Sequence, residues 1–68
     1  MRLISQDGKD DVPYETNTLY VEEGKLIAYG SVVEWVLGVF DSDAKAMNEL
    51  KKIRTAYASG RMIYKIGE

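Results

Sequence analysis

The chain has 68 residues, of which 46% are hydrophobic and 29% charged, and its formal net charge is −2. It contains neither cysteine nor histidine, which excludes disulfides, thiolate zinc sites and catalysis by a histidine base. We expect a single domain over residues 1–68, and we expect self-association to help stabilise it, because a domain of this size buries only about 60% of its unfolded surface.

The first predicted unit is a hairpin at the start of the chain. Residues 2–6 alternate weakly between polar and apolar side chains, and Asp7-Gly8 is a strong turn signal between two strands. Residues 11–15 supply the return strand. Pro13 confines this strand to a sheet edge, because proline has no N–H to donate.

A second hairpin is predicted directly after a short connector. Residues 19–22 and 25–29 are its strands, and Glu23-Gly24 is its turn. Gly30-Ser31 then interrupts the pattern. Residues 32–40 follow as the third long β segment, rich in β-branched and aromatic side chains.

Segment 32–40 is mostly apolar on both of its sides. One side carries Val33, Trp35, Leu37 and Val39, and the other carries Val32, Glu34, Val36, Gly38 and Phe40. Strands of this kind are usually buried on both faces, whereas a single helix covers only one. We therefore expect the second face to pack against another subunit, or against the N-terminal hairpin folded over it.

A helix is predicted over about residues 42–59. Asp41 or Ser42 can accept hydrogen bonds from the first turn, where Asp43 adds a favourable charge, and Gly60 suits the C-terminal cap. Apolar side chains recur at helical spacing and predict the buried stripe. Its members are Ala46, Leu50, Ile53 and Tyr57.

Together these elements predict an α+β fold. It comprises a small antiparallel or mixed sheet of four to five strands, one helix packed on one face, and a final strand over residues 61–66. The helix can connect strand 32–40 to strand 61–66 by a right-handed crossover, which makes those two strands parallel.

The charges are divided unevenly along the chain. Residues 1–43 sum to −6 and residues 44–68 to +4. The two halves attract one another within the fold or between subunits, or they are solvated faces of opposite sign. No apolar run is long enough to cross a membrane and no leader pattern is found. With the lack of cysteine, this leads us to expect a cytoplasmic protein without a membrane partner.

Reactive groups are few. Asp7, Asp10, Asp11 and Glu15 gather around the first turn, and hard cations prefer carboxylates, but the spacing of a calcium loop is missing. A solvated acidic turn is the simpler interpretation, and the sequence leaves open whether segment 7–15 binds a cation. The serines have no histidine partner, so we predict no enzyme and assign no catalytic, cofactor or metal residue.

The aromatic side chains give the predicted contact residues, which are Trp35, Tyr20, Tyr29 and Tyr64. Large aromatics are frequent anchors of protein interfaces. The alternative is a small nucleic-acid-binding accessory protein that uses sheet aromatics beside basic residues, as Tyr64 stands beside Lys65. The acidic first half opposes this alternative, because it repels phosphate.

Two segments resemble a known group of proteins. The opening MRLISQDG and the following DVPYE resemble the start of short uncharacterised proteins of Gram-positive bacteria and their phages. The segment Gly38-Val39-Phe40-Asp41-Ser42, followed by a helix with Ala46, is similar to a later part of the same proteins. The resemblance implies a phage or prophage setting and no activity, cofactor or catalytic residue.

These observations predict a non-enzymatic protein-interaction or structural accessory module of phage or prophage type. We expect it to form a homo-oligomer, and another protein is the further candidate partner. No cofactor is expected.

Overall fold

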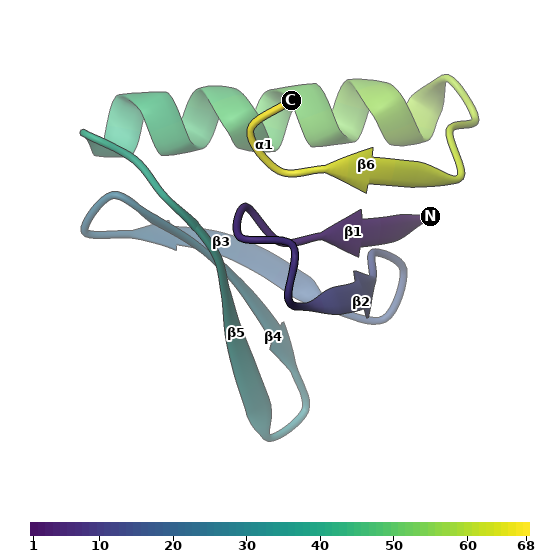
Figure 1. Ribbon diagram of the computed structural model, residues 1–68, viewed down its shortest axis with the longest axis horizontal. Helices are drawn as coiled ribbons and strands as arrows, with labels where there is room; N and C mark the ends of the chain where they lie inside the picture. The colour runs from purple at the N-terminus through teal and green to yellow at the C-terminus, as the bar shows by residue number, and fades with distance from the viewer.

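The computed structural model describes residues 1–68 and contains one helix and two sheets of three strands each. The elements in chain order are β1 (Arg2–Ile4), β2 (Asp11–Pro13), β3 (Thr18–Glu22), β4 (Lys25–Gly30), β5 (Val33–Val39), α1 (Asp43–Ala58) and β6 (Ile63–Lys65). Figure 1 shows the helix along one side of the molecule, with β6 and β1 beneath it and the β4–β5 hairpin extending away from it. The α+β class is confirmed, but the strands divide between two sheets and do not form one sheet of four to five.

The smaller sheet joins the two ends of the chain in the order β2-β1-β6. β1 is antiparallel to β2 and parallel to β6. The predicted crossover between strand 32–40 and the final strand is wrong, because β6 pairs with β1. This pairing is favoured since it sets Tyr64 beside Leu3, and both side chains are buried in the core.

The larger sheet is the antiparallel meander β3-β4-β5. As predicted, Glu23-Gly24 makes a two-residue turn between β3 and β4, and both residues have positive φ, 50° and 74°. This backbone matches the right-handed twist of a hairpin. At the other end of β4, Gly30 leaves room for the Asn17 side chain, whose Oδ1 lies 2.7 Å from where a Cβ would stand.

A β-bulge interrupts the pairing of β4 with β5. Leu26 is opposite Gly38 and Ile27 is opposite Val36, so Leu37 is the extra residue of β5. Leu37 is buried in the core, and Gly38 lies close to the Ile66 side chain. Because a bulge shifts the alternation by one residue, Val39 lies on the same face as Val36 and not, as predicted, on the side of Trp35.

Helix α1 begins and ends close to the predicted residues. The Ser42 side chain accepts from the backbone N–H of Lys45 at 3.2 Å, which caps the first turn. Asp43 accepts from the backbone N–H of Gly24 at 2.6 Å, so the start of the helix is tied to the β3–β4 turn. The helix is too short and too polar to cross a membrane.

The core lies between α1 and the inner faces of both sheets. Its ten residues are Leu3, Val12, Leu26, Ala28, Leu37, Leu50, Ile53, Ala56, Tyr64 and Ile66. The predicted helix stripe is confirmed at Ala46, Leu50 and Ile53 but not at Tyr57, which is exposed and packs on Tyr14 with ring centroids 4.7 Å apart. Ala56, one residue earlier, is the buried member of the last turn.

Two glycine substitutions separate backbone strain from crowding. Gly24 and Gly60 both have positive φ, but a Cβ on Gly24 would lie 2.7 Å from the Phe40 carbonyl oxygen, whereas a Cβ on Gly60 meets nothing within 4 Å. We expect Gly60→Ala to cost about 1 kcal/mol of unfolding free energy, from φ alone. Gly24→Ala should cost roughly 1–3 kcal/mol more, because the backbone there is crowded. Urea denaturation of both variants measures the difference, and equal losses would contradict the packing described for this turn.

Candidate interaction surface

The face of the larger sheet that points away from α1 carries a group of apolar side chains. We call it the outer sheet face, and its apolar members are Tyr20, Ile27, Tyr29, Val36 and Val39. Side chains alternate along β4, so those of Ile27 and Tyr29 point to the face opposite that of the core residues Leu26 and Ala28. The register then assigns Tyr20 of β3 and Val36 of β5 to the same side, one on each flank of Ile27.

A hydrogen bond crosses this face from one edge strand to the other. The Tyr20 hydroxyl donates to Glu34 Oε1 at 2.7 Å, so the Tyr20 side chain reaches from β3 across β4 to β5. Ile27 beneath it is only 5% exposed, although it lies outside the main core cluster. The outer sheet face therefore has an ordered centre of its own, with Ile27 under Tyr20.

The β5 side of the outer sheet face remains open to solvent. Val36 is 49% exposed and Val39 is 58% exposed. These positions lie on the hairpin that extends away from α1 in Figure 1, and α1 itself packs against β3 and β4 from the other face. Contiguous exposed apolar side chains on a sheet are typical of an interaction site.

The four predicted contact residues fall in two different places. Tyr20 and Tyr29 are half-buried and lie together on the outer sheet face. Trp35 is opposite Ala28 on the inner face and packs, half-buried, against the core. Tyr64 is only 3% exposed and belongs to the core itself.

Sequence reasoning did not single out Ile27, Val36 and Val39 as contact residues. Val36 and Val39 stood in the apolar segment, but regular alternation placed them on opposite sides. The Leu37 bulge brings them to the same face. The only sequence signal for it is the Leu37-Gly38 pair, since glycine inside a strand often marks a bulge.

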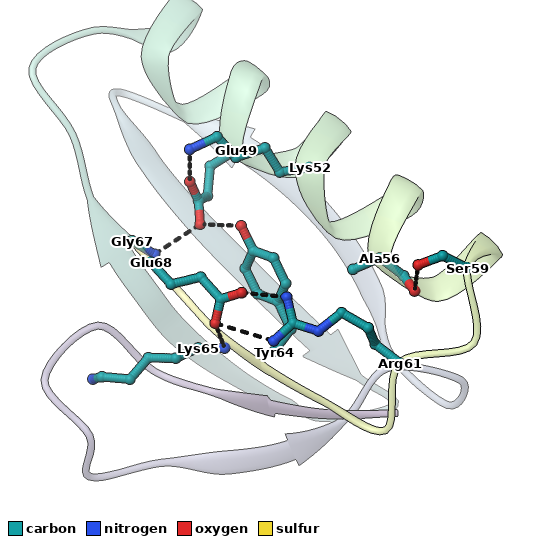
Figure 2. Close-up of polar contacts among 9 residues, drawn as sticks. All are labelled: Glu49, Lys52, Ala56, Ser59, Arg61, Tyr64, Lys65, Gly67 and Glu68. Atoms are coloured by element: carbon teal, nitrogen blue, oxygen red, sulfur yellow. Dashed lines mark hydrogen bonds and ion pairs between the residues drawn. The ribbon is translucent and has the colours of Figure 1, made fainter.

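A second, buried polar group lies under the C-terminal end of the chain (Figure 2). Glu49 of α1 is only 4% exposed, and its Oε2 accepts from the Tyr64 hydroxyl at 2.8 Å and from the Gly67 backbone N–H at 2.7 Å. Lys52 Nζ lies 3.7 Å from the other oxygen. The carboxylate therefore fixes β6 and the segment after it to the helix.

Two phenols have raised pKa values. Burial, and then the hydrogen bond to Glu49, raise the pKa of Tyr64. The hydrogen bond to Glu34 raises the pKa of Tyr20 to about 12. Both phenols donate a hydrogen bond to a carboxylate, and both hold their protons more tightly than free tyrosine.

The acidic turn is held by hydrogen bonds within the turn itself. Asp7 Oδ1 accepts from Ser5 Oγ at 2.6 Å and from the Lys9 N–H at 3.0 Å. These two hydrogen bonds, that of Ser5 first, lower the pKa of the Asp7 carboxyl. No three acidic side chains of the chain gather closely enough to hold a metal ion.

Comparisons with protein-family models, with curated proteins and with solved structures find no match for this chain.

The Glu49 carboxylate provides the first prediction from this region. Glu49→Ala leaves the Tyr64 hydroxyl and the Gly67 N–H without an acceptor, and we expect it to cost about 2–3 kcal/mol of unfolding free energy. Glu49→Gln retains one oxygen that can accept both bonds, so its cost should be about 1 kcal/mol or less. Lys52→Ala is the control, because the Lys52 side chain is exposed and its ammonium lies 3.7 Å from the carboxylate, and it should change stability by less than about 0.5 kcal/mol. Equal losses for Glu49→Ala and Lys52→Ala in denaturant titrations would refute this role.

The Tyr20–Glu34 hydrogen bond can be tested by titration. With Glu34→Gln, the pKa of Tyr20 should fall from about 12 toward its ordinary value near 10, because the carboxylate no longer stabilises the protonated phenol. The same linkage means that the stability contributed by this bond is fully present below about pH 10 and is lost as the pH rises to about 12. Carbon NMR of the hydroxyl-bearing ring carbon measures the shift, with Tyr64 as the internal reference that Glu34→Gln should leave unchanged. A Tyr20 titration that does not respond would contradict the bond.

Proposed function

We propose that this protein is a non-enzymatic interaction module that self-associates through its larger sheet. The observation that carries the proposal is the exposure of Val36 and Val39 beside the half-buried Tyr20 and Tyr29 on the outer sheet face. Burial of such side chains is favourable by about 25 cal/mol per Å² of apolar surface. A second copy is the first partner we propose, and a different protein of the same cell is the other.

Several features support a binding module over an enzyme. The chain has no cysteine or histidine. Its two perturbed phenols hold their protons more tightly than usual. The Glu49 carboxylate is occupied by Tyr64 and Gly67 in a structural role.

The biological setting we propose is that of a phage or prophage accessory protein acting in the cytoplasm. Its support is the likeness of the opening MRLISQDG and DVPYE segments to short proteins of Gram-positive bacteria and their phages, together with the absence of cysteine.

The nucleic-acid alternative has weaker support. Tyr20 and Tyr29 lie on a face that also carries Glu34. Tyr64, which stood beside Lys65 in the sequence, is buried and cannot stack on a base. Phosphate binding needs basic side chains near the stacking aromatics, and Lys25 is the basic residue that shares the outer sheet face.

Sedimentation analysis over a wide concentration range tests self-association. We expect the wild-type chain to shift from monomer to dimer as its concentration rises, and Val36→Glu to raise the dimer dissociation constant at least tenfold, which is about 1.4 kcal/mol. The physical reason is that a glutamate carboxylate would have to be buried without a partner.

Met62→Glu is the matched control, because Met62 is 80% exposed and lies in the turn between α1 and β6, away from the outer sheet face. It should leave the dissociation constant unchanged. A wild-type chain that stays monomeric at high micromolar concentration, or a Met62→Glu variant that weakens association equally, would overturn the proposal.

A further inference from the structure

The free edge of β5 offers a second kind of contact. β5 and β3 are the two edge strands of the larger sheet, and β5, with seven residues, is the longest strand in the chain. It contains no proline or lysine, and Glu34 is its one charged residue. Edge strands without such protection are templates for pairing with another strand.

The register shows which backbone groups are open. A two-residue turn joins β3 to β4, and paired residues in an antiparallel ladder alternate between bonded and non-bonded positions. Ala28 and Gly30 therefore bond toward β5, where they meet Trp35 and Val33. The N–H and C=O groups of the intervening Glu34 and Val36 consequently face the free edge, and residues 33–36 make no backbone hydrogen bond outside the sheet.

One end of this edge is already occupied by the loop after β1. The Gln6 N–H donates to the Leu37 carbonyl at 2.7 Å, and Gln6 Oε1 accepts from the Val39 N–H at 3.0 Å. Backbone hydrogen bonding to a partner strand can therefore extend from the hairpin tip as far as Val36 and no further. The open edge has a defined length.

We propose that β5 pairs antiparallel with β5 of a second copy, with Trp35 at the two-fold axis, and this inference rests on the self-association proposed above. In this register Glu34 of each copy lies opposite Val36 of the other, and the open groups of both residues are satisfied. The two Trp35 side chains meet as a cross-strand aromatic pair. The larger sheets of the two copies then join into a single sheet of six strands.

Charge and the Gln6 contact select this register over its neighbours. Shifting the axis to Glu34 sets two carboxylates directly opposite one another, which is destabilising. Shifting it to Val36 sets Glu34 opposite Gly38, between Leu37 and Val39, whose edge groups Gln6 occupies. A short edge of this kind buries less than a standard interface, so the pairing is weak and depends on concentration.

The absence of cysteine allows a clean cross-linking test in the full chain. Glu34→Cys and Val36→Cys variants are prepared separately, distinguished by mass, mixed and oxidised with diamide. In the proposed register the mixed pair has Cα atoms about 5.5 Å apart, within disulfide range. Two copies of the same variant, whether Glu34→Cys or Val36→Cys, have their thiols out of register, with Cα atoms more than about 7 Å apart. The mixed disulfide should therefore exceed the Val36→Cys homodisulfide, whose variant keeps the Glu34 charge, several-fold.

The outcomes separate this inference from the proposed function. Dominant linkage of Val36→Cys to itself, a variant that keeps Glu34 and the Gln6 contact, would overturn the register. Wild-type self-association without any excess of the mixed disulfide would overturn edge pairing while the outer sheet face remains the interface. A wild-type chain that never associates would overturn both.

Discussion

One helix of sixteen residues has to close the core over two sheets, and this constraint governs the rest of the molecule. α1 packs on the inner face of β3 and β4, and the core gathers beneath it. Nothing comparable covers the other side of the larger sheet. The side chains there protect one another only in part, since Ile27 is buried under Tyr20 while Val36 and Val39 stay open. The exposure of the outer sheet face is therefore a direct result of how few elements the chain contains.

Polar contacts supplement the small apolar core by joining distant parts of the chain. Gln6 links the loop after β1 to the end of β5, Asp43 links the helix start to the β3–β4 turn, and Glu49 links the helix to the C-terminal segment. Each contact joins parts of the chain that are distant in sequence. A buried carboxylate is costly unless its hydrogen bonds are made, and Glu49 makes them with Tyr64 and Gly67. These contacts define which sheet lies against which part of the helix.

The local features of the fold could be predicted from the sequence, and the non-local ones could not. The turn at Glu23-Gly24 and the helix cap at Ser42 depend on backbone geometry within a few residues, so the predictions of the second hairpin and of the helix start were correct. The strand that pairs with β6 depends on which strand edge lies nearby once the chain has folded, and the alternation of polar and apolar residues does not encode that choice. The Leu37 bulge had a similar effect, because one extra residue moved Val39 to the other face. Glu49 was overlooked because a carboxylate on a helix is usually solvated, whereas Tyr57 was placed inside by spacing alone.

Two features of β5 affect how far an assembly of this chain could grow. They are the Gln6 contact and the isolated charge of Glu34. An exposed apolar edge that pairs without limit produces fibres. A two-fold pairing uses the same edge in both copies, so neither copy retains that edge for a third. In the proposed pairing, Gln6 would prevent the partner strand from sliding toward Val39, and Glu34 would prevent it from sliding toward the hairpin tip, because two carboxylates would then face each other. The two residues would thus restrict the proposed pairing of β5 to one register and to a closed pair.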